Sequence, residues 1–275
     1  MLLGVHCSVS GGLQNAFAEA ERLDIDTFQI FTQNQRQWLN KKIDAPLLQL
    51  FTKAWDHKKV KIIFSHCSYL LNLASINEDI RKKSINALVG EIKRCDILGL
   101  SYCVLHPGSY KDHTPEGAIK NIITGLEHVL ELTDFSKVKI LLENTAGQGS
   151  SIGFKFEHLK EIIEGIRSKR IGVCFDTCHA FSAGYDLRND AAFAKTFNEF
   201  DKIVGLQNLN AIHLNDTKTD IGSRVDRHDN IGQGKLGLEC FRLILKEFTH
   251  LPKVLETPKE ENWDERNLAL LRSLV

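Results

Sequence analysis

Side chains that bind metal ions stand at the ends of apolar, strand-like segments in this sequence. Six segments finish on such a residue: His66, His106, Glu143, Asp176, His213 and Glu256. A set of imidazoles and carboxylates without clustered thiolates suits zinc, manganese or iron. Several cations are needed to balance so many ligands. The sequence therefore predicts a multinuclear metal centre, on condition that the fold brings the six residues together.

Three further candidate ligands lie just beyond strand-like segments. His179 follows Asp176 by three residues, close enough to reach the same place from the following turn. Asp226 and His228 are two positions apart in the loop SRVDRHDNIGQG, and residues two apart in an extended segment point to the same side. His179, Asp226 and His228 have the composition to hold one more ion.

Any one of these positions, taken singly, is more often a structural or surface residue than a ligand, so the prediction depends on the whole set. Five other histidines fall in helical or loop segments, and we interpret them as structural or solvated: His57, His113, His128, His158 and His250. Cys174 and Cys178 bracket Asp176, but no second cysteine pair accompanies them. Structural thiols are therefore favoured over thiolate ligands.

The elements that must position these residues are eight short apolar runs rich in β-branched side chains. The runs, each typical of a strand, cover residues 2–7, 26–32, 60–66, 102–108, 138–145, 171–177, 209–215 and 252–257. Segments with helical periodicity lie between them; residues 114–133, for example, open on a Thr cap followed by Pro. This alternation predicts an α/β fold, a (β/α)8 TIM barrel that forms a single domain over residues 1–275.

An open doubly wound sheet is the alternative to a barrel. The G-x-G-x-x-G motif of its dinucleotide-binding form is missing after the first strand, which counts against that form. In a parallel barrel the carboxyl ends of all strands converge on one rim. A barrel would therefore gather the candidate ligands from distant parts of the sequence into one pocket.

The composition is that of an ordinary globular protein. Of 275 residues, 43% are hydrophobic, no apolar run reaches eighteen residues, and the N-terminus lacks the basic segment of a signal peptide. We therefore expect a cytoplasmic protein without disulfides and without a membrane partner. Lys and Arg total 35, as do Asp and Glu, so the bulk charge gives no sign of a polyanionic partner. If some of the carboxylates hold metal cations, the rest of the surface is more positively charged than this equal count of acidic and basic residues suggests.

Several stretches around the candidate ligands resemble motifs of the endonuclease IV family of apurinic/apyrimidinic endonucleases. The resemblance runs from the first strand to the last and is carried by HCSYLLNLA (66–74), HPGSY (106–110), ENTAGQGSSIG (143–153), GVCFDTCH (172–179) and IHLNDTKTDIGSRVDRHDNIGQG (212–234). It implies a (β/α)8 barrel with three zinc ions at its rim, acting on double-stranded DNA that contains abasic sites. Gln233 stands where the family commonly has Glu, and Cys67 where a small or acidic residue is usual; neither is a ligand.

The resemblance also implies a role for each ligand. The matched ligands are His66, His106 and Glu143 for the first ion; Glu143 as a bridge, Asp176, His213 and Glu256 for the second; and His179, Asp226 and His228 for the third. Zinc lowers the pKa of a shared water, and the bridging Glu143 would position the resulting hydroxide for attack on phosphorus. Cutting 5′ to an abasic site would leave a 3′-hydroxyl and a 5′-deoxyribose phosphate, and removal of 3′-blocking groups is a further implied activity.

Loops beside the rim offer side chains that could recognise damage. The loop QNQRQW (33–38) offers Arg36 and Trp38, and Tyr69 and Leu70 offer an aromatic and an apolar wedge after the third strand. Such residues can fill a gap in the base stack and hold an extruded nucleotide. We predict that Arg36, Tyr69 and Leu70 bind DNA, and we expect the protein to be a monomer.

Two other functions remain open from the sequence. A metal-dependent sugar isomerase or epimerase on a similar barrel uses ligands at strand ends, but it needs one or two ions and has no use for His179, Asp226 and His228 together. A non-catalytic protein that binds damaged DNA would tolerate the loss of ligands, whereas every ligand position is filled here. The number of ions per chain separates these functions most directly.

Overall fold

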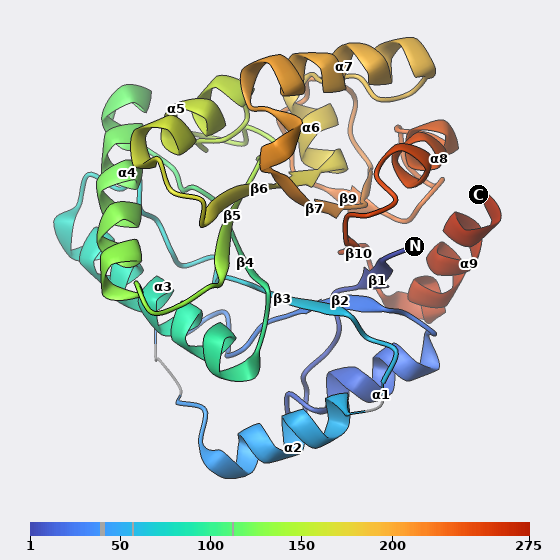
Figure 1. The fold of residues 1–275 in the computed structure, drawn as a ribbon. Coiled ribbons are helices and arrows are strands. Elements are labelled where there is room, and N and C mark those ends of the chain that lie inside the picture. The colour runs from blue at the N-terminus through green and yellow to red at the C-terminus, as the bar shows by residue number, and fades with distance from the viewer. Residues whose placement is uncertain (39–41, 57, 112) are drawn as a thin grey trace.

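Eight parallel strands form a ring at the centre of the molecule, and helices surround it (Figure 1). The structure is a computed structural model that describes residues 1–38, 42–56, 58–111 and 113–275. The strands of the ring are β1 (Leu3–Val5), β2 (Thr27–Ile30), β3 (Ile62–His66), β4 (Tyr102–Leu105), β5 (Lys139–Glu143), β6 (Ile171–Asp176), β7 (Leu209–His213) and β10 (Lys253–Leu255). They hydrogen-bond in the order β1-β10-β7-β6-β5-β4-β3-β2, so each of the eight predicted runs forms a strand.

The ring closes between β1 and β2. His6 and Gln29 form a parallel bridge there, and the amide of Cys7 donates to the carbonyl of Gln29 at 2.8 Å. This close approach requires glycine at position 4, because a Cβ on Gly4 would lie 1.7 Å from the carbonyl oxygen of Thr27. The predicted (β/α)8 barrel is confirmed, and the alternative of an open sheet is wrong.

Helices return the chain from the end of each strand to the start of the next. They are α1 (Asn15–Arg22), α2 (Ala45–Trp55), α3 (Glu78–Leu98), α4 (Pro115–Leu132), α5 (Phe156–Ile166), α6 (Thr177–Ala183), α7 (Asp190–Ile203), α8 (Leu238–Glu247) and α9 (Trp263–Ser273), with the short 3₁₀ helices η1 (Leu206–Asn208) and η2 (Glu260–Asn262). α4 begins where predicted, because the Thr114 hydroxyl accepts from the Gly117 amide and Pro115 follows the cap. Two helices, α6 and α7, connect β6 to β7.

A small antiparallel pair lies in the long connection after β7, where β8 (Asp216–Thr217) pairs with β9 (His228–Asp229). The buried carboxylate of Asp216 anchors this connection by accepting four backbone amides, those of Thr217, Gly232, Gly234 and Leu236. Such a concentration of donors holds both sides of the hairpin against one side chain. The segment that carries Asp226 and His228 is therefore tied to the barrel.

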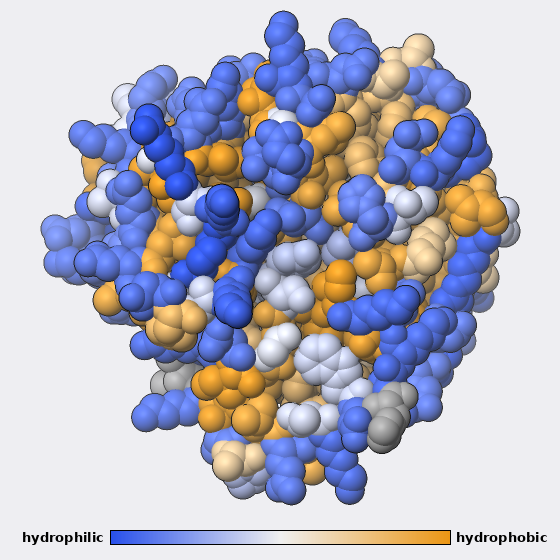
Figure 2. All heavy atoms as spheres, viewed as in Figure 1, coloured by the Kyte–Doolittle hydropathy of each residue, from blue (hydrophilic) through white to orange (hydrophobic). Residues whose placement is uncertain are grey.

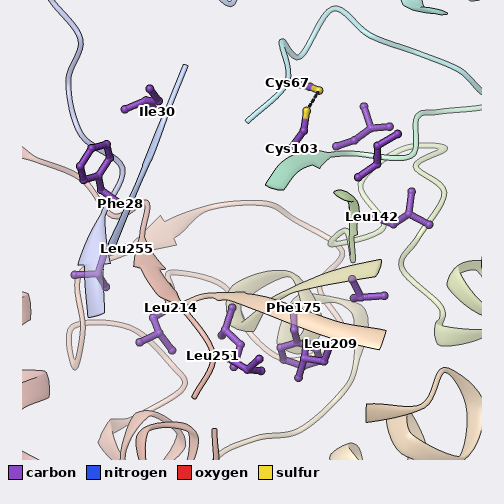
Figure 3. Close-up of a cluster of buried hydrophobic side chains, with 14 of the residues drawn as sticks. Phe28, Ile30, Cys67, Cys103, Leu142, Phe175, Leu209, Leu214, Leu251 and Leu255 are labelled. Atoms are coloured by element: carbon purple, nitrogen blue, oxygen red, sulfur yellow. Dashed lines mark hydrogen bonds between the residues drawn. The ribbon is translucent and has the colours of Figure 1, made fainter. Parts of the chain in front are cut away.

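The hydrophobic core has two layers, which strand alternation separates. The larger layer lies between the strands and the helices and includes Phe28, Leu142, Phe175 and Leu255, which Figure 3 labels. The smaller layer fills the inside of the barrel and takes one side chain from each of six strands: Phe64, Val104, Leu141, Cys174, Ala211 and Val254. Alternate residues of a strand thus face the helices and the barrel interior.

The outer helices turn their polar sides to solvent. On the face shown in Figure 2, hydrophilic side chains dominate the periphery, and hydrophobic ones show in patches between them. α5, for example, buries Phe156, Leu159 and Ile162 on one side, the spacing of an amphipathic helix. Among the described residues no helix combines the length and the apolar character that crossing a membrane requires.

Candidate metal centre

Strand alternation directs the six strand-end ligands into the mouth of the barrel. Each residue of the interior layer is followed two positions later by a predicted ligand, in the order His66, His106, Glu143, Asp176, His213 and Glu256. Side chains two apart on a strand share a face, so the ligands extend the interior layer toward the carboxyl ends of the strands. β4 and β10 end one residue before His106 and Glu256, and the other four strands end on the ligand itself.

Glu143 lies at the centre of the group and is fully buried. Its Oε2 lies 3.1 Å from His66 Nε2 and 3.2 Å from His106 Nε2. Its Oε1 faces the other way, 3.1 Å from His213 Nδ1 and 3.2 Å from His179 Nδ1. The two carboxylate oxygens thus lie next to different pairs of histidines. A carboxylate that bridges two metal ions needs this arrangement.

Four groups of possible metal-binding atoms occur among the described residues, and three of them match the sets that the family resemblance implies. Within each set the atoms lie no more than 4.8 Å apart, and the sets are His66, His106 and Glu143; Glu143, Asp176, His213 and Glu256; and His179, Asp226 and His228. The fourth group consists of Asp176, Cys178 and His228, whose donor atoms also lie within 4.8 Å of one another. Burial, and then the charge of Asp176, raise the pKa of the Cys178 thiol to about 12, which favours its structural role over a thiolate ligand.

The third set joins two segments of the chain. We expected His179 on a turn, but it lies in the first turn of α6, where the Asp176 carboxylate caps the helix by accepting from the His179 amide at 2.7 Å. The local preference of Asp for a helix cap explains this difference. His179 Nε2 lies 3.2 Å from Asp226 Oδ2, and His228 Nε2 lies 3.4 Å from Asp226 Oδ1.

Hydrogen bonds decide which ring nitrogen most of these histidines turn to the centre. Three rings donate Nδ1–H to a backbone carbonyl at 2.7, 2.9 and 3.1 Å: His66 to Cys67, His179 to Asn144, and His228 to Glu256. In each ring the Nε2 lone pair is therefore free to bind a metal. Among the described residues, the buried Nε2 atoms of His179 and His228 have no hydrogen-bond partner, which fits two nitrogens that hold an ion.

Two asparagines support the carboxylates from behind. Asn215 donates from Nδ2 to Asp176 Oδ2 at 2.6 Å and accepts the Glu256 amide on Oδ1 at 2.8 Å. Asn144 accepts the Asp176 amide on Oδ1 at 2.8 Å and donates to its carbonyl oxygen at 3.0 Å. These bonds orient the ligands from outside the donor sets, and sequence reasoning did not identify either asparagine.

His6 and Gln29 are two further residues of the site that sequence reasoning missed. Gln29 Oε1 lies 2.9 Å from His213 Nε2, and Gln29 Nε2 lies 2.5 Å from Glu256 Oε1 and 2.9 Å from His6 Nδ1. The strand position could have identified His6, because His6 is two residues after Gly4, which pairs in register with Val254 of the interior layer. It could not have identified Gln29, which pairs in register with Phe64 and so lies at the level of the interior layer itself. Together, His6 and Gln29 extend the ring of polar side chains to all eight strands.

Burial and opposite charges act against each other in the centre. Burial raises the pKa of Glu143, but His213 and His106 outweigh it and hold that pKa well below its usual range. Burial lowers the pKa of His179, but Asp176, Asp226 and Glu143 outweigh it and raise that pKa well above its usual range. The histidines therefore keep Glu143 ionised, and the cluster draws in positive charge, as a site for divalent cations would.

One of the predicted DNA-binding residues, Tyr69, lies beside this centre. Tyr69 is 60% exposed, and its ring centroid lies 5.4 Å from that of His66 and 5.8 Å from that of His106. Arg36 is exposed and Leu70 is partly exposed. The Ser68 hydroxyl donates to the Gln35 carbonyl and so joins the two loops. His57, one of the five histidines set aside, lies outside the described residues.

The fold and the ring of ligands define a class, and a family model described as xylose isomerase-like TIM barrel matches residues 17–274. Within that class, the chain is 44% identical to "Probable endonuclease 4" of Chloroflexus aggregans over 277 residues, which cover 99% of this chain and 97% of the relative. It is 43% identical to the protein of the same description from Geotalea daltonii, with 99% and 98% coverage. The chain belongs to the endonuclease IV family of xylose isomerase-like TIM barrels.

Solved structures give the same result. Endonuclease IV from Thermus thermophilus superposes with a TM-score of 0.89 at 32% identity, covering 100% of this chain and 98% of that one. A D-tagatose 3-epimerase-like protein superposes with a TM-score of 0.79 at 22% identity, covering 100% and 97%. Because the sequence identity to the epimerase-like protein is only 22%, this similarity shows the fold alone.

Proposed function

We propose that this chain is a zinc-dependent DNA-repair endonuclease that hydrolyses the phosphodiester 5′ to an abasic site in duplex DNA. Relatives that share more than two fifths of its residues are described as endonucleases, which supports a nuclease. Three ions would be held by the three donor sets. The products are a 3′-hydroxyl and a 5′-deoxyribose phosphate, and 3′-blocking groups would be removed at the same site.

The observation that carries this proposal is the third donor set, built in addition to the two at the strand ends. His179, Asp226 and His228 converge from α6 and from the hairpin after β7. Nε2 of His179 and of His228 are buried and have no hydrogen-bond partner in the part of the chain that the structure describes. A sugar epimerase, the alternative function, works with one or two ions and would gain nothing from this set. Its presence favours the nuclease.

The residues of the chain have distinct parts in the proposed reaction. Bound zinc ions would supply Lewis acidity, activating water and stabilising the charge that develops on the departing oxygen. Glu143 orients the two neighbouring sets relative to each other, because each of its oxygens faces a different pair of histidines. Six charges from three dications against the four carboxylates of the sets leave the pocket positive, and a phosphodiester is drawn to it.

Recognition of the abasic nucleotide falls to the loops. Tyr69 offers an exposed aromatic ring directly beside His66 and His106, and Leu70 and Arg36 lie on the two joined loops. An aromatic or apolar wedge can occupy the space that a missing base leaves. We assign Arg36, Tyr69 and Leu70 to this task.

The proposal also includes the oligomeric state and the cellular location of the protein. We propose that it works as a monomer of one domain in the cytoplasm. All seven cysteines are free and buried, which suits a compartment that keeps thiols reduced.

Two measurements on one preparation test the function. Elemental analysis should find about three zinc ions per chain, as three donor sets require. A duplex with a single tetrahydrofuran abasic analogue should be cut on its 5′ side, leaving an end that a DNA polymerase extends, while the matched undamaged duplex stays intact. One or two ions per chain without cleavage would favour the epimerase, and selective binding of the abasic duplex without cleavage would favour a damage-binding protein.

A further inference from the structure

The loop after β5 (residues 144–155) and the hairpin after β7 meet at a hydrogen bond between Gln148 and Asp226. Gln148, an exposed residue, accepts the backbone amide of Asp226 on its side-chain Oε1 at 3.0 Å, across 78 positions of sequence. A backbone N–H can only donate, so the orientation of the Gln148 amide follows from this contact whether or not any ion is bound. The bond brings a residue outside the three donor sets to the backbone of a predicted ligand.

Asp226 is the member of the third donor set that regular structure holds least. His179 lies in α6 and His228 opens β9, and each imidazole has a bond between Nδ1 and a backbone carbonyl. Asp226 lies two residues before β9, and its side chain is 41% exposed. Its carboxylate oxygens face the two imidazoles, one each, at 3.2 and 3.4 Å. The direction of this carboxylate therefore depends on how the Asp226 backbone is held.

A backbone bond of the hairpin holds the residue after Asp226, but the Asp226 amide itself turns to Gln148. The Arg227 carbonyl accepts the Lys218 amide at 3.0 Å, across the hairpin. In the described part of the chain, the Asp226 amide has no hydrogen-bond partner other than Gln148. Holding the backbone on both sides of the Asp226 Cα fixes the direction of the Cα–Cβ bond, and with it the position of the carboxylate.

The loop that supplies the acceptor is itself fastened to the rim of the barrel. The Gln148 carbonyl accepts the Ser151 hydroxyl at 2.8 Å, which fixes the turn that carries the Gln148 side chain. The Tyr110 amide donates to the Ser150 carbonyl at 3.0 Å, and Ser109 and Ser151 form an antiparallel bridge. The last two contacts join this loop to the loop after β4. Gln148 therefore extends from a hydrogen-bonded frame that belongs to two strands of the barrel.

We propose that Gln148 is a positioning residue for the third ion: its side-chain oxygen holds the Asp226 backbone so that the carboxylate faces His179 and His228. Gln148 does not touch the ion, and it acts on the affinity of the third set through Asp226. Outer partners of this kind set metal affinity by orienting the ligands. The inference rests on the proposed function, because only a third ion gives this geometry a use.

Two substitutions of Gln148 separate the hydrogen-bond acceptor from the bulk of the side chain. Gln148→Met keeps an unbranched side chain of similar length without a carbonyl acceptor, whereas Gln148→Glu keeps oxygens that accept the amide. Each protein is equilibrated with buffered free zinc over a range of concentrations, and its bound zinc is counted by elemental analysis. The free zinc concentration that half-fills the third set should rise about tenfold to a hundredfold in Gln148→Met and stay within about threefold in Gln148→Glu. The first two sets should fill as in the unaltered protein.

The control is Gln49→Met, which makes the same change at an exposed position of α2 and should leave zinc binding unchanged. Unchanged zinc binding by Gln148→Met would overturn the inference, as would equal losses in Gln148→Met and Gln148→Glu. Loss of every ion from Gln148→Met would overturn it too, because that pattern marks a general structural role. An unaltered protein that never holds a third ion would instead count against the proposed function.

Amide hydrogen exchange reads the bond without relying on activity or on the number of ions. In the purified ¹⁵N-labelled protein the Asp226 amide should exchange slowly, and its exchange should become at least about tenfold faster in Gln148→Met and stay slow in Gln148→Glu. The Lys218 amide, which donates to the Arg227 carbonyl within the hairpin, is the internal reference and should exchange at the same rate in both variants. Rapid exchange of the Asp226 amide in the unaltered protein would overturn the inference, even if a Gln148 variant fails to fold.

Discussion

Single residues of the metal centre work through the ring nitrogen that each histidine turns inward. His66, His179 and His228 present Nε2 because a backbone carbonyl takes Nδ1–H, whereas His213 presents Nδ1 because Gln29 takes Nε2–H. Outer hydrogen bonds of this kind fix the tautomer before any ion arrives. The donor sets are therefore prepared for metal by the fold.

The first prediction concerns His228. His228→Ala should lower the zinc content by about one ion per chain and slow cleavage of the abasic duplex on the order of a thousandfold, because a cation that stabilises transition-state charge is lost. Folding should survive, since the other two sets stand on the barrel strands. Elemental analysis, circular dichroism and single-turnover cleavage on one preparation check this. His128→Ala, which changes an exposed histidine of α4, is the matched control. If the His228→Ala protein binds the full amount of zinc and is fully active, His179, Asp226 and His228 do not form a third metal site.

Elements of the fold divide the work between strands that hold ligands and loops that meet the substrate. The strands present ligands on a rigid, hydrogen-bonded frame, and the loops can vary in shape around it. The loop after β3 is tied to the loop after β2 through Ser68 and Gln35. These two loops are therefore expected to act as one surface.

At this scale, replacing Tyr69 and Leu70 together with Ala should weaken binding of the abasic duplex about tenfold or more and leave binding of undamaged duplex nearly unchanged, because only the damaged stack has a gap to fill. Equilibrium binding to both duplexes gives the answer. Phe135→Ala is the matched control, since Phe135 is 58% exposed, close to the 60% of Tyr69, and lies between α4 and β5. If affinity for both duplexes falls equally, Tyr69 and Leu70 have a packing role and do not recognise the abasic site.

The connection after β7 should depend on Asp216. In Asp216→Asn, one of the two oxygens that accept backbone amides becomes an NH₂ group, which cannot accept hydrogen bonds from them. The free energy of unfolding should therefore fall by about 1–3 kcal/mol. The third ion should also bind more weakly. Urea unfolding and zinc analysis measure both effects. Asp220→Asn, at an exposed position of the same connection, is expected to change neither. Unchanged zinc content in Asp216→Asn would show that the hairpin holds its ligands without this anchor.

On the scale of the whole molecule, the ions of the first two sets would be enclosed by ligands from six strands of a closed ring, and the third ion by ligands from α6 and the hairpin after β7. An ion held in this way leaves slowly, because several ligands from different elements of the fold must release it. Cleavage should therefore persist in low concentrations of EDTA and decline over time, unlike that of a nuclease that borrows magnesium from solution. The check is activity followed over hours after chelator is added. Immediate loss that magnesium alone restores would contradict the zinc assignment.

The sequence by itself determined the strands, the barrel and the candidate ligands. These features are local: an apolar run predicts a strand, and the alternation of its side chains makes the residue two positions after Phe64 or Leu141 point to the same side. Residue type then limits what that position can bind. The three sets are a prediction from resemblance, and in the structure the donor atoms of each set lie close together.

Only the tertiary structure decided how the ligands are oriented. The partners of Gln29 lie 184 and 227 positions away, at His213 and Glu256, and no local pattern connects them. His179 entered a helix because the Asp176 side chain caps it, which the spacing alone did not reveal. Tautomers and unpaired donors depend on hydrogen-bond partners from distant strands, and closure of the barrel is what brings those strands together.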